Sequence, residues 1–423
     1  MSLDVNISEP DEFNCVELHN CIQSVAAIKE IRDYTYHVDI VSGKGANYVA
    51  NVFRISIVES GTDKKLSVIV KTLVNTLRQD VFRELHKREV LAYMEVIDKF
   101  VDLQTVISID KRIILPKFIF SSVEMNNEVI VLEDMLLSGF IADSKVAQFE
   151  KLDYPQVRLI LTELAKFHGL SFVFEYKRQN FKSIQSDFED IIFNEQFLDN
   201  SKLRNYFVES FQTSLNLIDK TNIKENLEQN KDNILDLLRR YTKPRKYNVF
   251  CHGDYWINNI LFKEGEEQKI CFLDFQAMRF ASPVTDILYF LYICTDSKFR
   301  ANYFTDLIND YHDSLKSFLD LFQIDADEVF PKNEFENDLE EMLPFGLLVA
   351  LIELKLVTTT PDDVEITENM DTPGLGDIIY MPGGEELYKL RVNDVIDESD
   401  ANGVLNQLLN DLNVKKPQLS ITS

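Results

Sequence analysis

The hydrophobic pattern of the first third of the chain is that of a β-sheet. Runs rich in β-branched residues, bounded by glycine, aspartate and lysine, lie at 36–41, 48–58, 66–73, 112–120 and 128–133. Such runs between turn residues are typical of strands. Near 14–32 and 78–98, apolar residues instead recur at helical spacing. The pattern predicts an N-terminal lobe over residues 1–135, with a five-stranded sheet and a helix.

Beyond residue 135 the pattern becomes mainly helical. Helical spacing predicts helices at about 155–175, 203–218, 223–241 and in the span 284–358. A β-rich island at 247–275 interrupts them, with strand-like runs at 257–263 and 269–273. From about residue 360 the sequence is acidic and contains prolines, which predicts a partly irregular tail. The expected fold class is α+β, with a β-rich N-terminal lobe and a larger helical C-terminal lobe over 136–423.

The negative net charge of the chain argues against certain classes of binding partner. The formal net charge is -26, and 45% of the residues are hydrophobic, which is enough for a packed interior. Nucleic-acid binding needs a basic face that displaces counterions from phosphates, and an anionic membrane surface also attracts basic segments. The most apolar stretch, 343–357, carries Glu353 and Lys355 and is shorter than the ~20 residues that span a bilayer. We therefore expect neither a nucleic-acid nor a membrane partner, and no obligate protein partner is evident.

The cysteines and the N-terminal residues indicate a cellular compartment. Five cysteines occur without a CxxC pair, which fits a reduced protein better than a disulfide framework or a zinc site. The first residues, MSLDVNISEPDEF, are acidic and lack the apolar core of a signal peptide. We expect a cytoplasmic protein.

The strongest chemical pattern lies in the β-rich island, where HGDYWINNILF at 252–262 is followed by Leu273-Asp274-Phe275. In phosphoryl transfer from ATP, a loop carboxylate orients the acceptor hydroxyl, while an Asn and a second Asp hold Mg²⁺. Asp254, Asn259 and Asp274 have these types at a suitable spacing, and a hairpin would bring Asp274 beside Asn259. Their oxygens suit Mg²⁺. The alternative is a turn in which these side chains only cap local structure, but the combined pattern is specific enough to favour the catalytic interpretation.

A glycine-containing loop lies between the first two strand-like runs. Its candidate phosphate-binding residues are Gly43, Lys44, Gly45 and Asn47. Glycines would let backbone amides approach the phosphates of ATP closely. An ordinary hairpin turn has the same composition, so the loop alone is a weak signal.

Lys71 lies in the apolar strand-like run 66–73 and is a candidate phosphate-binding lysine. A lysine on a solvent-exposed strand edge is the alternative. In the helix that follows, Glu89 is a better partner for Lys71 than Glu84, because Glu89 begins an apolar stretch. The order of these features along the chain, from the glycine loop to Asp274, supports all of them together.

The run Val131-Leu132-Glu133-Asp134-Met135 ends the β-rich part of the chain. An apolar strand that ends in a short polar stretch at this change fits a hinge between lobes. Backbone groups near Glu133 and Met135 would then bind the edge of adenine. A simple linker predicts the same residues.

These motifs together resemble the insect ecdysteroid kinase-like, or CHK kinase-like, family, whose members are related to choline kinases and aminoglycoside phosphotransferases. The densest match is HGDYWINNILF with FLDFQAMRFASPVTDILYFL, and further matching segments are GKGANYVANVFRI, SVIVKTL, HKREVLAYMEV, VLEDM and LTELAKFHGLSF. The resemblance runs from about residue 40 to 360. One departure is Ala46, where the family often has an acidic residue.

The resemblance implies a two-lobed, protein-kinase-like fold and ATP-dependent phosphorylation of a small-molecule alcohol. It implies that Asp254 is the catalytic base, that Asn259 and Asp274 bind Mg²⁺, and that Lys71 and Glu89 form the phosphate-binding ion pair. The implied acceptor is an ecdysteroid-like or other apolar alcohol. Choline or another amino alcohol, a xenobiotic conjugate, and a catalytically inactive binding protein remain alternatives.

The sequence itself argues against a protein kinase. After Asp274-Phe275-Gln276, too few residues precede the next helix to form an activation segment, and Gly253 stands where an arginine would bind a phosphorylated loop. The extra sequence lies instead at 175–246, and we expect it to form the acceptor pocket with 284–358. Aromatic side chains of this region, from Phe172 to Phe211, would form walls of the pocket or, more commonly for such residues, helix core. Trp256 is a candidate acceptor contact, with buried packing as the alternative.

Overall fold

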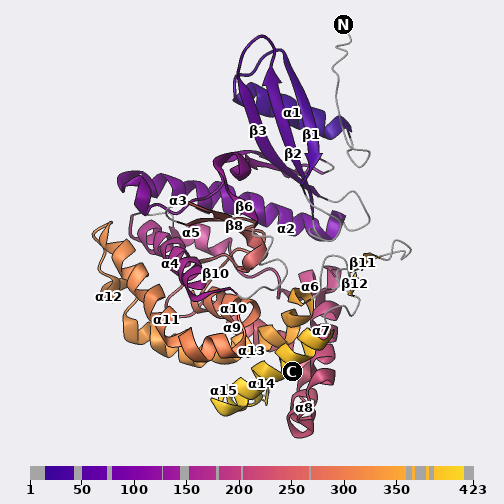
Figure 1. Ribbon diagram of the computed structural model, residues 1–423, viewed down its shortest axis with the longest axis vertical. Helices are drawn as coiled ribbons and strands as arrows, with labels where there is room; N and C mark the ends of the chain where they lie inside the picture. The colour runs from indigo at the N-terminus through magenta and orange to yellow at the C-terminus, as the bar shows by residue number, and fades with distance from the viewer. Residues whose placement is uncertain are drawn as a thin grey trace, which may run out of the picture.

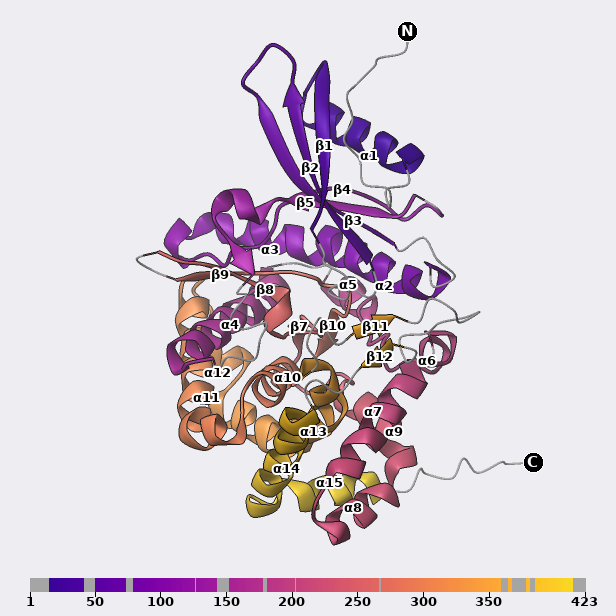
Figure 2. The same cartoon turned by 45° about the vertical axis from the view of Figure 1, so that its right-hand side comes forward.

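The computed structural model describes residues 15–41, 50–73, 79–125, 127–142, 152–177, 181–201, 203–265, 268–358, 364–366, 378–380 and 385–413. Within them, a sheet-containing lobe lies above a larger helical lobe (Figure 1). Helices α2 and α3 lie between the sheet and the helical lobe (Figure 2). The predicted two-lobed α+β fold is therefore confirmed.

The N-terminal lobe is built on a five-stranded antiparallel sheet in the order β1-β2-β3-β5-β4. Its strands are β1 Tyr34–Ile40, β2 Ala50–Glu59, β3 Lys65–Leu73, β4 Phe118–Ser122 and β5 Val129–Glu133. One face packs on helix α1, Cys15–Ile28, through buried side chains such as Ile55 and Val70. Side chains alternate between the two faces of a strand. Lys71, which follows Val70, therefore points to the face that meets α2 and the helical lobe.

Helix α2, Gln79–Leu91, continues into a π-helical turn, Ala92–Ile97, and then into α3, Asp98–Leu103. Buried side chains on this segment, including Phe82 and Tyr93, belong to the same apolar core as the helical lobe. The segment is thus the packing layer between the sheet and the C-terminal helices.

The C-terminal lobe contains long helices that pack in pairs. Helix α4, Tyr154–Lys177, packs along α11, Ser297–Asp320, and α10, Val284–Cys294, packs along α13, Lys332–Val357. The shorter helices are α5 Phe181–Ser186, α6 Glu195–Ser201, α7 Leu203–Leu217, α8 Thr221–Glu228, α9 Ile234–Tyr241 and α12 Ala326–Val329.

The β-rich island forms two small sheets that support the site. Strands β8, Ile260–Lys263, and β9, Lys269–Phe272, pair as a hairpin, which β6, Ile141–Ala142, extends. Strand β7, Val249–Cys251, pairs with β10, Arg279–Ala281. The predicted hairpin is therefore present, although residues 257–259 form a 3₁₀ turn rather than the start of a strand.

Three expected elements differ in extent. The run at 112–120 becomes a strand only from Phe118, because Pro116 cannot donate to a sheet ladder. The expected helix at 223–241 is broken between α8 and α9 at 229–233, where the Asn230 side chain donates to the carbonyl of Asn226 and so competes with the helical backbone bond. The tail beyond 360 includes short paired strands, β11 Val364–Ile366 and β12 Ile378–Tyr380.

Two helices of the tail are part of the folded lobe. These are α14, Glu385–Ala401, and α15, Val404–Asn413, and both pack on α13. Val392, Ile396 and Leu408 are fully buried there. Arg300 of α11 is buried and forms an ion pair with Glu398 of α14. Among the residues described, no helix has the length and apolarity needed to cross a bilayer.

Candidate active site

Lys71 on β3 faces two carboxylates. Its Nζ lies 2.6 Å from Oε2 of Glu89 on α2 and 3.0 Å from Oδ1 of Asp274. Burial lowers the pKa of Lys71, but the attraction of Asp274 and Glu89 outweighs this and raises it overall. Burial raises the pKa of Glu89, while Lys71 opposes that rise. The ammonium of Lys71 thus joins the sheet, α2 and the hairpin of the helical lobe at one point.

Asp274 and Asn259 lie side by side at the end of the β8–β9 hairpin. The backbone N–H of Leu273 donates to the carbonyl of Asn259 at 2.9 Å, which extends the ladder by one bond. Asp274 then adopts a left-handed backbone with φ of 65°. The Asn259 amide nitrogen donates to both the backbone O and Oδ2 of Asp254, at 2.9 and 3.0 Å, so its Oδ1 points away from Asp254.

Asp254 is held on both carboxylate oxygens. Tyr289 of α10 donates to Oδ1 at 3.0 Å, and Asn259 donates to Oδ2. Burial raises the pKa of Asp254, and the negative charge of Asp274 raises it further. The two hydrogen bonds, from Asn259 and from Tyr289 on α10, fix the orientation of the Asp254 carboxylate.

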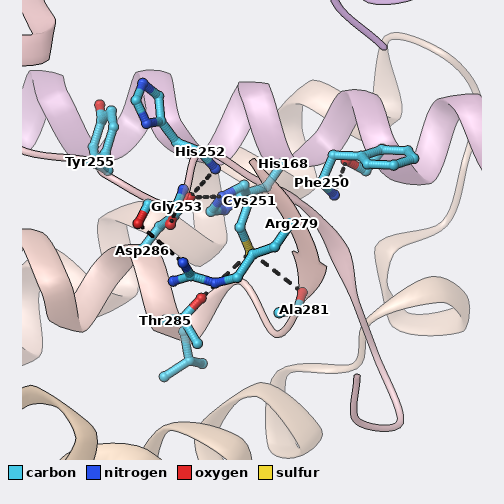
Figure 3. Close-up of polar contacts among 12 residues, drawn as sticks. His168, Phe250, Cys251, His252, Gly253, Tyr255, Arg279, Ala281, Thr285 and Asp286 are labelled. Carbon is cyan, nitrogen blue, oxygen red and sulfur yellow. Dashed lines mark hydrogen bonds and ion pairs between the residues drawn. The ribbon is translucent and has the colours of Figure 1, made fainter. Parts of the chain in front are cut away.

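The backbone of the loop that leads into Asp254, residues 252–254, is anchored by Asp286 at the start of α10 (Figure 3). Asp286 Oδ2 accepts from the N–H of His252 at 2.6 Å, and Oδ1 accepts from the N–H of Gly253 at 3.0 Å. His168 Nε2 also lies 3.2 Å from Oδ2, and its Nδ1 is 2.7 Å from the hydroxyl of Tyr311. Burial raises the pKa of Asp286, but His168, Arg279 and His252 together outweigh this and lower it overall. A buried charged group therefore fixes the loop just before Asp254.

Two neighbours of Asp254 set the shape of the loop. Gly253 has a φ of 87°, and a Cβ there would lie 1.9 Å from the carbonyl oxygen of Ala277. His252 Nε2 is 2.8 Å from the carbonyl of Leu273, and its Nδ1 accepts the N–H of Asp254 at 3.4 Å. His252 thus holds the loop against the strand that leads to Asp274.

On the α10 side of Asp254 lies a second carboxylate. Tyr206 of α7 donates to Glu353 Oε2 at 2.9 Å, and Glu353 lies on α13. Burial raises the pKa of Glu353 to about 7, and the charge of Asp254 contributes to this rise. Tyr206, Tyr289 and Glu353 come from the two regions that the sequence assigns to the acceptor pocket.

The other site residues predicted from the sequence are the glycine loop, Glu133, Met135 and Trp256, and the structure describes only the last three. The glycine loop with Gly43, Lys44, Gly45 and Asn47 lies outside the described residues. Glu133 ends β5, and Met135 is buried in a small cluster with Phe140 and Cys271. Trp256 is partly buried against the core of the helical lobe.

The candidate hinge after β5 contains an interaction that the sequence did not indicate. Asp134 is buried, and its Oδ2 accepts from Arg54 Nε at 2.9 Å and from Ser67 Oγ at 2.7 Å. Its Oδ1 accepts the N–H of Leu136 at 3.1 Å. One side chain therefore ties the end of β5 to β2 and β3.

Most aromatic side chains proposed as pocket walls belong to the core. The buried ones are Phe172, Phe174, Phe181, Phe188, Phe193, Phe197, Phe207 and Phe211. Tyr176 is exposed, and only Tyr206 of this set shares a hydrogen bond with a side chain near Asp254 among the described residues. The more common interpretation, helix core, is therefore the right one for these phenylalanines.

Three residues with contacts at the site were missed. Asp286 and Tyr289 both lie in the segment SPVTDILYFL, where their signal is polar groups in an otherwise apolar helix. Glu353 shows the same signal in the apolar stretch 343–357, where it served only as evidence against a membrane span. A charge that interrupts a buried helix face is costly unless it is paired, so such a charge marks a site.

Comparison with solved structures finds several kinases of small molecules. A choline kinase from Cryptosporidium parvum Iowa II is 16% identical, with 92% of this chain and 99% of that chain covered and a TM-score of 0.48. A microcompartment-associated aminopropanol kinase is 12% identical, with 92% and 99% covered and a TM-score of 0.46. A spectinomycin phosphotransferase in complex with ADP and spectinomycin is 15% identical, with 92% and 98% covered and a TM-score of 0.39.

The sequence comparisons give one match. No curated protein matches the chain. The family described as ecdysteroid kinase-like matches residues 44–324, which include Lys71, Asp254, Asn259 and Asp274. Because this match spans more than half of the 423 residues, the chain belongs to the ecdysteroid kinase-like family.

Proposed function

We propose that the protein is an ATP-dependent kinase that phosphorylates a hydroxyl group of a small-molecule alcohol. The observation that carries this proposal is the convergence of Lys71, Glu89, Asp274, Asn259 and Asp254, which are linked by hydrogen bonds across both lobes. Phosphoryl transfer requires little more than positioning and charge stabilisation, and these are the residue types that provide them. Family membership supports the same activity.

The donor set fits Mg²⁺. Asp274 supplies a carboxylate and Asn259 an amide oxygen that points away from Asp254, and Mg²⁺ prefers such oxygens together with phosphates and water. Bound Mg²⁺ would neutralise charge on the phosphates of ATP. Lys71 would bind the same phosphates, held in place by Glu89.

Asp254 would accept the proton of the attacking hydroxyl. Tyr289 and Asn259 fix its orientation, so that one hydroxyl position on the acceptor is favoured. Its raised pKa makes the carboxylate a better proton acceptor than an exposed aspartate.

The test is ATP turnover with a panel of alcohols. We expect Asp254→Asn to lower kcat by about 100-fold or more, and Asp274→Ala to nearly abolish turnover. The neighbouring asparagines give a matched pair, because Asn259 is buried at the site and Asn258 is exposed. Asn259→Ala should lose activity and Asn258→Ala should retain it. Full activity of Asp254→Asn would refute the mechanism, and no turnover with any alcohol would favour an inactive binding protein.

The first candidate acceptor is an ecdysteroid-like or other apolar alcohol, and the family supports it. A second candidate, an amino alcohol, is favoured by a specific observation. Glu353 lies near Asp254, whose charge contributes to the raised pKa of Glu353. Two carboxylates close to one another attract an ammonium group.

A matched pair of acceptors separates the two candidates. Choline and 3,3-dimethylbutan-1-ol have the same shape but differ in charge, and 20-hydroxyecdysone represents the steroids. If an amino alcohol is the acceptor, choline should exceed its neutral analogue in kcat/KM, and Glu353→Gln should reduce that preference. Preference for the neutral steroid, unchanged by Glu353→Gln, would support the first candidate.

A further inference from the structure

A short segment between α5 and α6, residues 187–190, contacts both α2 and β10. On the α2 side, Arg88 donates from Nη1 to the carbonyl of Asp187 at 2.8 Å and from Nη2 to the carbonyl of Glu189 at 2.9 Å. The guanidinium lies over the ring of Phe188, with its centre 5.1 Å from the ring centroid. Arg88 thus binds the segment through two backbone groups and one ring face.

The contact is buried. Arg88 is 7% exposed and Phe188 is fully buried. Burial lowers the pKa of Arg88, although Asp190 and neighbouring acidic groups oppose this. A buried guanidinium is costly unless its donors are satisfied, so the two carbonyl bonds stabilise one position of α2 relative to the segment.

The other side of the segment meets β10, the strand whose Arg279 bonds to the loop before Asp254. The Phe280 N–H donates to the carbonyl of Phe188 at 2.7 Å. The next residue back on β10, Arg279, donates to the carbonyl of Gly253 at 3.1 Å and lies 3.6 Å from Asp190 Oδ2. The segment therefore bonds to the strand that also holds the residue before Asp254.

Arg88 is adjacent to Glu89 on α2. Neighbouring residues on a helix point about 100° apart, so Glu89 reaches Lys71 while Arg88 reaches the helical lobe. In kinases the Lys–Glu ion pair and the Mg²⁺-binding Asp must both be in place for transfer. A change in the position of α2 would alter the first of these.

We propose that Arg88 is a positioning residue that keeps Glu89 paired with Lys71 by binding the 187–190 segment. This proposal rests on the proposed kinase function. Here the position of α2 depends on backbone carbonyls and an aromatic ring, without a phosphorylated loop. The ion pair is therefore formed in the unmodified protein.

A double-mutant cycle tests whether Arg88 acts through Glu89. We expect Arg88→Gln and Glu89→Gln each to lower kcat/KM for ATP about tenfold, and the double variant to be no worse than Glu89→Gln alone. Arg112 is the matched control, because it also donates to backbone carbonyls, those of Thr105 and Ile107, within its own loop. Effects of Arg112→Gln and Glu89→Gln should multiply. Multiplying effects of Arg88→Gln and Glu89→Gln would overturn the proposal.

A second measurement does not depend on activity. Loss of Glu89 from Lys71 removes one of the two carboxylates that hold its ammonium group, so Lys71 becomes more accessible to an acylating reagent. Mass spectrometry should show faster labelling of Lys71 in Arg88→Gln but not in Arg112→Gln. If Arg88→Gln does not fold, Arg88→Lys keeps the charge and loses the paired geometry. Unchanged Lys71 labelling in the folded variant would refute the positioning role, whereas failure of the kinase function would appear only as absent turnover.

Discussion

At the scale of single residues, the site depends on two left-handed backbone positions. Gly253 and Asp274 have φ of 87° and 65°. Left-handed geometry costs side-chain-bearing residues roughly 1–2 kcal/mol, although aspartate tolerates it better than most. Strain of this kind persists where surrounding contacts fix it, here the bonds of Asp286 to the loop and of Lys71 to Asp274.

Gly253→Ala should destabilise the protein by more than the cost of placing alanine at a left-handed φ, because the new Cβ also clashes. Its Cβ would clash with the Ala277 carbonyl at 1.9 Å, whereas a Cβ at Gly61, with φ of 73°, meets nothing within 4 Å. We expect Gly61→Ala to cost about 1 kcal/mol and keep activity, while Gly253→Ala loses most activity. Urea unfolding and ATP turnover measure both. Equal effects of the two substitutions would contradict this role of Gly253.

Glu353 should make stability depend on pH. Its pKa is raised to about 7 in the folded protein, so the folded state binds the proton more readily than the unfolded chain. Stability is then lost as pH rises through 7, and Glu353→Gln should remove about 2 kcal/mol of the loss between pH 5.5 and 8.5. Urea unfolding at both pH values measures this. The control Glu340→Gln, an exposed position on α13, should keep the wild-type pH dependence. Parallel curves for wild type and Glu353→Gln would refute the burial of this charge.

Spacing along the chain was enough to identify the residues of one loop and one hairpin. Asp254, Asn259 and Asp274 are close in sequence, so the pattern predicted their proximity. The Lys71–Glu89 pair followed from an apolar stretch and is present in the structure. Glu353 stands out locally as a charge in an apolar stretch, but its partner Tyr206 on a distant helix could not be predicted, because helix packing creates the contact.

At the scale of elements, periodicity predicted strands and long helices but not where polar residues interrupt them. β2 and β3 alternate buried and less buried side chains, and α4 and α13 have continuous apolar faces. The tail was expected to be partly irregular because of its charge and prolines. Its helices form because buried side chains of α14 and α15 pack on α13, a tertiary effect that composition does not reveal.

The tail should therefore contribute to stability. Leu408 of α15 is fully buried, whereas Leu390 of α14 is 55% exposed. We expect Leu408→Ala to cost about 2–4 kcal/mol. Leu390→Ala should change stability by less than about 0.5 kcal/mol. Chemical denaturation of the full chain measures both, and a neutral Leu408→Ala would show that α15 does not pack on the lobe as described.

At the scale of the whole molecule, a chain with a net charge of -26 has a proposed site for another anion, ATP. Lys71 is the described cation at the centre of this site, and it is already paired with two carboxylates. Binding of nucleotide phosphates would then depend on Mg²⁺ to supply positive charge. The division at residue 135, just after β5, stays a prediction that fits the change from sheet to helices.

The excess of negative charge should make stability depend on salt. Like charges across the surface repel one another in the compact state, and salt screens them. Raising NaCl from about 0.05 to 0.5 M should raise the melting temperature at pH 8, because the Debye length shortens over this range. Differential scanning fluorimetry measures this. A lower melting temperature in salt would show that attractive ion pairs outweigh the repulsion.

The bonds between Arg88 and the 187–190 segment have a consequence for sequence variation. Arg88 donates to the backbone carbonyls of residues 187 and 189 and not to their side chains. Every amino acid has such a carbonyl. Substitutions at Asp187 and Glu189 should therefore be tolerated between relatives, while Phe188, whose ring packs under the guanidinium, should vary little. An inserted or deleted residue would shift the carbonyls out of register and should be rare. The spacing of this segment, rather than its composition, is what selection would preserve.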